Sequence, residues 1–172
     1  QAATSHNLGQ NFSKVFEIQF QNREGKMDHV WQTSWGLSTR SLGGLFLTHG
    51  DDNGLILPPK IAPIEVVIMP ILKSGSDGKK LAEYCQHVCE TLANAGIRFR
   101  LDDREEPSVG RRFNEWEVKG VPIRFEVGEK EVGYRTVTIA RRDTGEKVTV
   151  TRETMLVQTE RLLGEIQKAL YQ

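Results

Sequence analysis

The residues from Glu65 to Ile71, EVVIMPI, form a nearly continuous apolar run. Such a run is typical of a strand that is covered on both faces, as in a parallel sheet. A helical stripe follows over residues 77–95 and ends at Gly96, and a further strand is expected over residues 97–101. A strand, a helix and a second strand in this order favour a right-handed crossover. The sequence therefore predicts an α/β domain that begins at this run.

The residues after 101 continue the alternation of helices and strands. Residues 108–119 carry Phe113 and Trp116 at helical spacing, which predicts a second helix. We expect the remaining elements to be strands over 122–127, 136–140 and 147–150 and a last helix over 153–171. The prediction is an α/β fold with a mixed, mostly five-stranded sheet and three helices.

A proline-rich segment separates this domain from the residues before it. Pro58, Pro59 and Pro63 lie within six residues, a density that excludes a helix or a central strand. We therefore expect a stiff, extended linker over residues 58–64, with one part of the protein over residues 1–57 and a domain over 65–172.

The N-terminal part has strand patterns of another kind. Apolar and polar residues alternate over residues 15–21, and after a polar turn a second strand is expected over residues 29–36. Two such neighbours predict an antiparallel pair. The apolar run after Arg40, which closes at Gly50, predicts a short buried helix.

Charge and composition restrict the classes of function. The chain has 23 basic and 23 acidic residues, whereas proteins that bind nucleic acid through phosphates alone are usually basic. Contact with nucleic acid would therefore be local and would read base edges. No apolar run approaches the roughly 20 residues of a membrane span, so no membrane partner is expected. The polar start at Gln1 resembles neither an initiator nor a signal peptide and indicates a piece of a longer protein.

The two cysteines, Cys85 and Cys89, lie four residues apart on the helical stripe. Core positions are favoured over a metal pair because no further cysteine or ligand cluster completes a site. So few cysteines are consistent with a reducing, cytoplasmic location.

Five segments along the chain carry a resemblance to a known family. In chain order they are TSHNLGQNFSKVFEI, TSWGLSTR, HGDDNGLILPPKIAPIEVVI, FNEWEVKGVPIRFEVG and RRDTGEKVTV. Together they resemble prolyl-tRNA synthetases of the archaeal and eukaryotic type, in the order that this family shows. The resemblance implies that residues 1–57 are an antiparallel β remnant of a class II catalytic domain. It also implies that residues 65–172 are an anticodon-binding domain.

The resemblance further implies a ligase that activates proline with ATP and Mg²⁺ and transfers it to tRNA(Pro). TSWGLSTR corresponds to class motif 3, in which Arg40 is the catalytic residue that binds ATP. A planar, permanently charged guanidinium suits phosphate oxygens and can stack on adenine. The other residues that the resemblance assigns are Gln1, Thr4 and Ser38 to ATP, Gln1 also to a position near Mg²⁺, and His6 and Trp35 to the proline pocket. Taken alone, His6 could equally be a structural imidazole and Trp35 a core residue.

Within the second domain, the resemblance assigns four residues to the anticodon. Proline anticodons carry guanine at their second and third positions, and reading guanine requires donors to O6 and N7 and an acceptor for its N–H groups. The acceptor is Glu117, and the donors are Arg124, Lys130, in a turn, and Lys147. From spacing alone, ordinary solvated charges would be favoured at these positions. Arg141 and Arg142 would add charge that steers phosphates.

Several elements of the family are absent from this sequence. Motifs 1 and 2 and the C-terminal, often zinc-binding extension are missing, so we do not expect the chain alone to form prolyl-adenylate. The full-length enzyme is expected to be a homodimer. Two alternatives are a non-catalytic tRNA-binding module and a protein-interaction scaffold, and the latter would show no preference among tRNAs.

Overall fold

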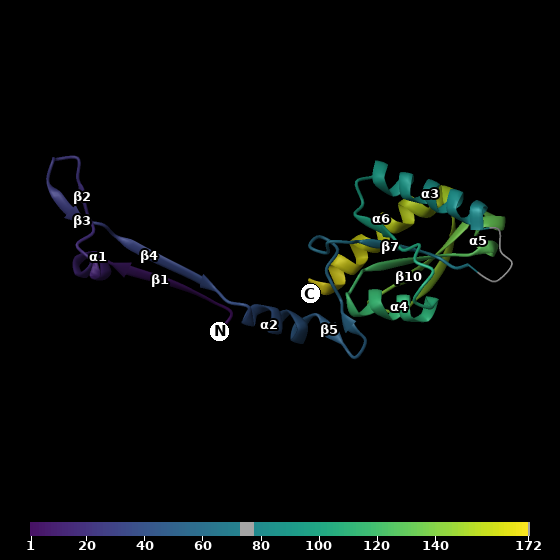
Figure 1. Cartoon of the computed structure of the whole chain (residues 1–172), viewed down its shortest axis with the longest axis horizontal. Coiled ribbons are helices and arrows are strands. Elements are labelled where there is room, and N and C mark those ends of the chain that lie inside the picture. The colour runs from purple at the N-terminus through teal and green to yellow at the C-terminus, as the bar shows by residue number, and fades with distance from the viewer. Residues whose placement is uncertain (73–77, 172) are drawn as a thin grey trace. The chain divides into compact units, whose positions relative to one another are not determined.

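The computed structural model describes residues 1–72 and 78–171. They group into two compact units, Gln1–Thr48 and His49–Gln172 (Figure 1). Residues 49–57, which we assigned to the N-terminal part, are grouped here with the second unit. The predicted boundary at residues 58–64 stays a prediction. Position 77, the expected start of a helix, lies outside the described residues.

The second unit contains the five-stranded mixed sheet that the sequence predicts, in the order β11-β10-β9-β7-β8. The central strand β7 (Val66–Pro70) pairs in parallel with β8 (Phe99–Leu101) and β9 (Ile123–Val127). Strand β10 (Thr136–Arg141) is antiparallel to β9 and to β11 (Lys147–Thr151). The apolar run of β7 is buried at every position, as expected for a strand covered on both faces.

Helices cover both faces of this sheet. Figure 1 shows α3 (Gly78–Asn94) and α6 (Arg152–Leu170) on one face and α4 (Val109–Val118) on the other. The main core lies between the sheet and the first two helices, and both cysteines are buried there with free thiols. A smaller core under α4 is formed by Val67, Met69, Trp116 and Val121. Because successive side chains of a strand point to opposite faces, β7 and β9 supply side chains to both faces of the sheet.

One helix of this unit was missed. Residues Glu129–Tyr134 form α5, where we expected only a turn that carries Lys130. The helix has only six residues, and none of them is buried. A helix without a buried face needs no apolar stripe, so its sequence carries no helical pattern. Its start is stabilised locally, because the backbone N–H of Gly128 donates to Glu131 Oε2 at 2.9 Å.

A short hairpin packs against the C-terminal end of α4. It consists of β5 (Gly50–Asp51) and β6 (Gly54–Leu55). Gly54 has a φ of +127°, and a Cβ there would lie 2.4 Å from Val118 Cα. The backbone of the hairpin therefore contacts the backbone of α4 directly, which requires glycine at this position. Arg142 donates to Asp51 Oδ2 at 2.8 Å and to the carbonyl of Glu117 at 3.0 Å. The hairpin and the end of α4 are therefore held as one piece.

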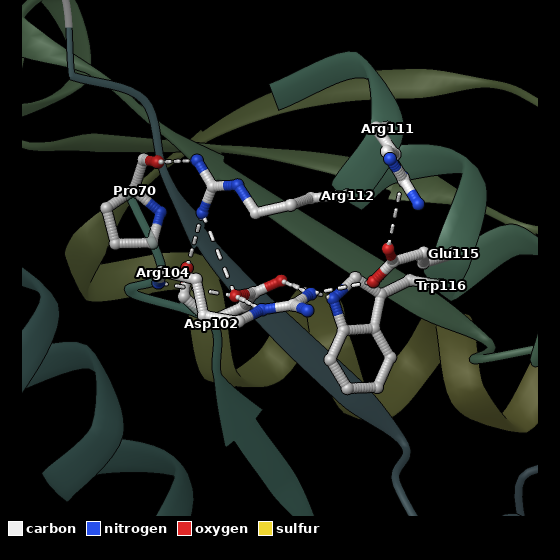
Figure 2. A network of polar contacts seen from close by, with 7 residues as sticks. All are labelled: Pro70, Asp102, Arg104, Arg111, Arg112, Glu115 and Trp116. Atoms are coloured by element: carbon white, nitrogen blue, oxygen red, sulfur yellow. Dashed lines mark hydrogen bonds and ion pairs between the residues drawn. The ribbon is translucent and has the colours of Figure 1, made fainter. Parts of the chain in front are cut away.

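The middle of α4 is held by a buried residue, Asp102, which follows β8 and is 3% exposed (Figure 2). Arg104 donates to its two oxygens from Nε and Nη2 at 2.8 and 2.9 Å. The indole Nε1 of Trp116 donates to Oδ2 at 2.7 Å. These donors hold the pKa of Asp102 well below its usual range against the opposing effect of burial, the hydrogen bonds from Arg104 being the largest cause.

Arg112 extends this network to the backbone of the sheet. Its Nη1 donates to the carbonyl of Asp102 at 2.8 Å and its Nη2 to that of Pro70 at 3.3 Å. In Figure 2 the guanidinium lies between these two carbonyls, which follow β8 and end β7. Because Arg112 and Trp116 both belong to α4, the network ties this helix to the carboxyl ends of two parallel strands.

The first unit differs from the strand predictions. The segment expected as a strand over 15–21 begins with the end of helix α1 (Asn11–Val15), and only β2 (Gln19–Gln21) is extended. Glu17 lies between them with a φ of 54°, which reverses the chain and interrupts the alternation. Strand β2 pairs antiparallel with β3 (Met27–His29), which lies mostly in the segment expected to be a turn, so the expected pairing of residues 15–21 with 29–36 was wrong.

The second predicted strand, residues 29–36, is also divided. Its later part is β4 (Gln32–Leu37), which pairs with an unpredicted strand, β1 (Ala3–Gly9). Helix α2 (Arg40–Thr48) forms where expected, but the prediction that it is buried was wrong. No element of its own unit packs extensively against it, so its apolar side chains remain exposed.

No helix among residues 1–72 and 78–171 is long and apolar enough to cross a membrane. Within the same ranges, no group of three or more His, Cys, Asp or Glu side chains could hold a metal ion.

We predict that Gly54→Ala lowers the free energy of unfolding by about 1–3 kcal/mol, because the new Cβ overlaps the backbone of Val118. Urea unfolding followed by circular dichroism measures the change. The control is Gly164→Ala inside α6, where a Cβ meets nothing within 4 Å. That substitution should raise stability by about 0.5–1 kcal/mol. Equal stability of Gly54→Ala and wild type would contradict the close contact.

We also predict that Asp102→Ala lowers the free energy of unfolding by about 3–5 kcal/mol, since it leaves buried donors unpaired. The control, Asp103→Ala, removes an exposed neighbour and should stay within about 0.5 kcal/mol of wild type. The folded pKa of Asp102 lies below the unfolded value near 4, so its ionised form stabilises the fold above that pH. Wild-type stability should fall as the pH drops below about 4, and less so in Asp102→Ala. Parallel pH profiles would argue against this role.

Candidate nucleic-acid interface

Two strands bring charged side chains to the face of the sheet that also carries α4. Lys147 on β11 and Arg124 on β9 are both paired in register with Ala140 on the strand between them. Directly opposite residues in antiparallel strands share a face, so Lys147 and Arg124 point the same way. The small side chain of Ala140 leaves space between them.

A carboxylate on β9 joins these two cations. Arg124 Nε and Nη2 donate to Glu126 Oε1 at 3.2 and 3.1 Å. Lys147 Nζ lies 2.8 Å from Glu126 Oε1 and 2.9 Å from Oε2. Glu117, at the end of α4, accepts a hydrogen bond from Arg124 Nη1 at 3.2 Å. We call these four residues, Glu117, Arg124, Glu126 and Lys147, the ion cluster.

An aromatic ring supports the ion cluster from α4. The Arg124 guanidinium carbon lies 4.1 Å from the centroid of the Phe113 ring, and Lys147 Nζ lies 6.0 Å from the same centroid. Both distances are within the range of cation–π attraction. Phe113 and Glu117 are four residues apart on α4, so one helical face supplies both the ring and the acceptor.

The ion cluster unites three of the four predicted anticodon residues, Glu117, Arg124 and Lys147. Lys130 is exposed on α5, and no hydrogen bond or ion pair joins it to the cluster in the part of the chain that the structure describes. Sequence reasoning missed Glu126 and the position of Phe113 beneath the cations. The only available signal was the alternation of β9, which places Glu126 two residues from Arg124 and hence on the same face.

Arg141 and Arg142 do not supply the free positive charge that we expected for phosphates. Arg141 forms ion pairs with Asp143 and Glu165, and Arg142 pairs with Asp51. The hydrogen bond to Asp143 is the main reason that the pKa of Arg141 is raised. Arg142 instead fixes the carbonyl of Glu117 and so stabilises the end of α4.

The residues that the resemblance assigns to ATP lie close together in the first unit. Gln1, Thr4, Ser38 and Arg40 line one hollow of about 270 Å³. Strand β1 supplies Thr4, and the loop between β4 and α2 supplies Ser38. Gly36 also lines the hollow, and a Cβ there would lie 3.1 Å from Thr4 Oγ1. A side chain at position 36 would therefore crowd Thr4.

The two residues assigned to proline are not brought together. Register pairs Ser5 with Trp35 and His6 with Ser34. Because neighbouring residues of a strand point to opposite faces, His6 and Trp35 lie on opposite faces of the β1–β4 ribbon. His6 shares its face with Thr4, on the strand that also lines the hollow.

The chain is similar to several named proline–tRNA ligases. The chain is 45% identical over 172 residues to a proline–tRNA ligase of Amoebophilus asiaticus, covering all of this chain and 35% of the relative. It is 46% identical over 176 residues to a chloroplastic/mitochondrial proline–tRNA ligase of Arabidopsis thaliana, with 99% of this chain and 32% of the relative covered. For a proline–tRNA ligase of Chloroflexus aurantiacus, the identity is 47% over 176 residues, with 100% and 36% covered.

The chain thus spans about a third of the length of these curated relatives. A family model described as an anticodon binding domain matches residues 65–158, which contain α4 and all five strands of the sheet. This match extends over more than half of the chain, and the chain therefore belongs to the family of anticodon-binding domains of class II aminoacyl-tRNA synthetases.

Proposed function

We propose that the second unit binds the anticodon loop of tRNA(Pro) and reads its guanines through the ion cluster. The observation that carries this proposal is the 3.2 Å contact between Glu117 and Arg124 on one face of the sheet. An acceptor and a donor held side by side match guanine, which presents O6 as an acceptor beside N–H donors. Glu117 is 41% exposed and Lys147 49%, so both can reach a base.

The charge of the ion cluster favours reading of bases over binding of phosphates. Two carboxylates and two cations give it no net charge, so it offers little general attraction to a polyanion. Lys130, which has no carboxylate partner among the described residues, is the better candidate for a phosphate contact. Selectivity then comes from the pattern of donors and acceptors, which suits an unstacked loop.

We further propose that the protein that contains this chain is a proline–tRNA ligase, with Arg40 contacting ATP. The hollow beside Arg40 offers a guanidinium, two hydroxyls and an amide, which fit the phosphates and ribose of a nucleotide. Arg40 would neutralise charge that develops on the departing pyrophosphate. Gln1 alone does not make a Mg²⁺ site, and no acidic cluster accompanies it in the described residues. Thr4 and His6 share a face, so His6 is the better candidate for a proline contact than Trp35.

The resemblance alone supports a homodimeric full-length enzyme and a cytoplasmic location. The alternative is a tRNA-binding module without catalysis. The hollow beside Arg40 favours the ligase, because a module that only binds tRNA has no use for a nucleotide pocket.

We predict that Glu117→Ala or Arg124→Ala weakens binding of the proline anticodon loop by roughly 1–3 kcal/mol, about 5- to 150-fold. Fluorescence anisotropy with a labelled stem-loop measures the affinity. Matched controls are Glu160→Ala and Lys168→Ala, exposed charges on α6 across the sheet, which should bind as wild type does. Circular dichroism should be unchanged in all four variants. If the first two variants bind the loop as tightly as wild type, the assignment is wrong.

We predict that Arg40→Ala in the full-length protein slows proline-dependent exchange of pyrophosphate into ATP by about 10²- to 10³-fold. The matched control is Lys14→Ala, an exposed cation of α1, which should leave the rate unchanged. An unaltered rate in Arg40→Ala would remove this residue from the ATP site. A wild-type protein that shows no exchange would instead favour the tRNA-binding module.

A further inference from the structure

We propose that Glu126 is a positioning residue for guanine recognition, whose single carboxylate holds Arg124 and Lys147 and fixes which of their donors face the base. This inference rests on the proposed function of the ion cluster. Glu126 is the one member of the cluster that contacts both cations. Glu117, in contrast, contacts Arg124 through Oε1.

The burial of the inner pair makes this contact persistent. The side chains of Glu126 and Arg124 are each 12% exposed, whereas Glu117 and Lys147 are much more open to solvent. Separating two nearly buried charges leaves each without a partner, which is strongly unfavourable. We therefore infer that the bond between Glu126 and Arg124 remains when a base binds, and that Glu117 is the member that turns toward the ligand.

The contacts leave a defined pair of donors on Arg124. A guanidinium has five N–H groups. Nε and Nη2 donate to Glu126, and Nη1 donates to Glu117, which engages three of them. One N–H on each of Nη1 and Nη2 has no acceptor among the described residues. Donors from the two terminal nitrogens of one guanidinium are what the O6 and N7 of guanine accept.

The position of Glu126 also fixes the orientation of the guanidinium plane. Phe113 supports one face of the plane at 4.1 Å, while Glu126 and Glu117 hold it from two sides within the plane. Rotation of the guanidinium plane about the Cδ–Nε bond would break one of these contacts. Without Glu126, Arg124 could rotate toward Glu117 or a phosphate, and Lys147 would extend into solvent. Selectivity among bases would then fall, while attraction to any phosphate backbone would rise.

The test compares affinities for anticodon stem-loops that carry guanine or adenine at the second or the third anticodon position. Adenine keeps the N7 acceptor but replaces O6 with an amino donor and the N1 donor with an acceptor, so it loses one of the two acceptors for Arg124 and the N1–H that Glu117 would accept. The wild-type chain should prefer guanine by roughly 5- to 150-fold at a position that it reads. In Glu126→Gln this ratio should fall toward 1, while binding of both loops is equal to or tighter than in wild type.

Two further variants separate positioning from charge. Glu160→Gln removes the same charge from an exposed position on α6, and its guanine-to-adenine ratio should equal that of wild type. Glu126→Asp keeps the charge but shortens the side chain by one methylene, so it cannot reach both cations and should give an intermediate ratio. If Glu126→Gln fails to fold by circular dichroism, the ratio of Glu126→Asp decides the question.

The outcomes distinguish this inference from the proposed function. A folded Glu126 variant with the wild-type ratio overturns the positioning role and leaves the proposed function standing. A wild-type chain that binds guanine and adenine loops equally overturns both. A lower ratio in Glu126→Gln, with an unchanged ratio in Glu160→Gln, supports the inference.

Discussion

The buried carboxylate of Asp102 is the interaction on which the geometry of the second unit depends. It lies just after β8 and accepts hydrogen bonds from Arg104 and Trp116, while its own carbonyl binds Arg112. Two of these donors belong to α4, so the carboxylate fixes the rotation and the height of that helix above the sheet. A buried charge with several donors has few alternative arrangements of comparable energy. The direction in which α4 presents Phe113 and Glu117 follows from this.

The far end of α4 is fixed by different physics. There Gly54 of the hairpin packs directly against the backbone of α4 because it has no side chain. Arg142 joins Asp51 of the hairpin to the carbonyl of Glu117. The hydrogen bonds from Arg142 lower the pKa of Asp51 to about 2, so the pair stays charged across the physiological range. Asp102 and Asp51 thus hold α4 at its middle and at its C-terminal end. A helix of ten residues that is held at two places can present an acceptor accurately.

The ion cluster is compatible with the proposed recognition of tRNA by a chain without net charge. Its cations are balanced by neighbouring carboxylates, and the arginines expected to attract phosphates, Arg141 and Arg142, are engaged in ion pairs. What remains on the surface is an alternation of donors and acceptors above an aromatic ring. Such a surface discriminates between bases more than it increases affinity for nucleic acid in general.

The sequence by itself determined the elements whose signal is local. The apolar run of β7, the stripes of α3 and α6 and the parallel pairing expected of a β–α–β unit follow from periodicity and chain direction. In contrast, only tertiary structure decided which charges pair. Glu126 joins Lys147 across β10, and Arg142 joins Asp51 over 91 residues, and neither contact has a sequence signature. The same holds for Trp35 and His6, because register sets their faces. The period of apolar residues in a segment shows which of its faces is buried. Ion pairs, in contrast, join residues of different segments, which lie close together only in the folded chain.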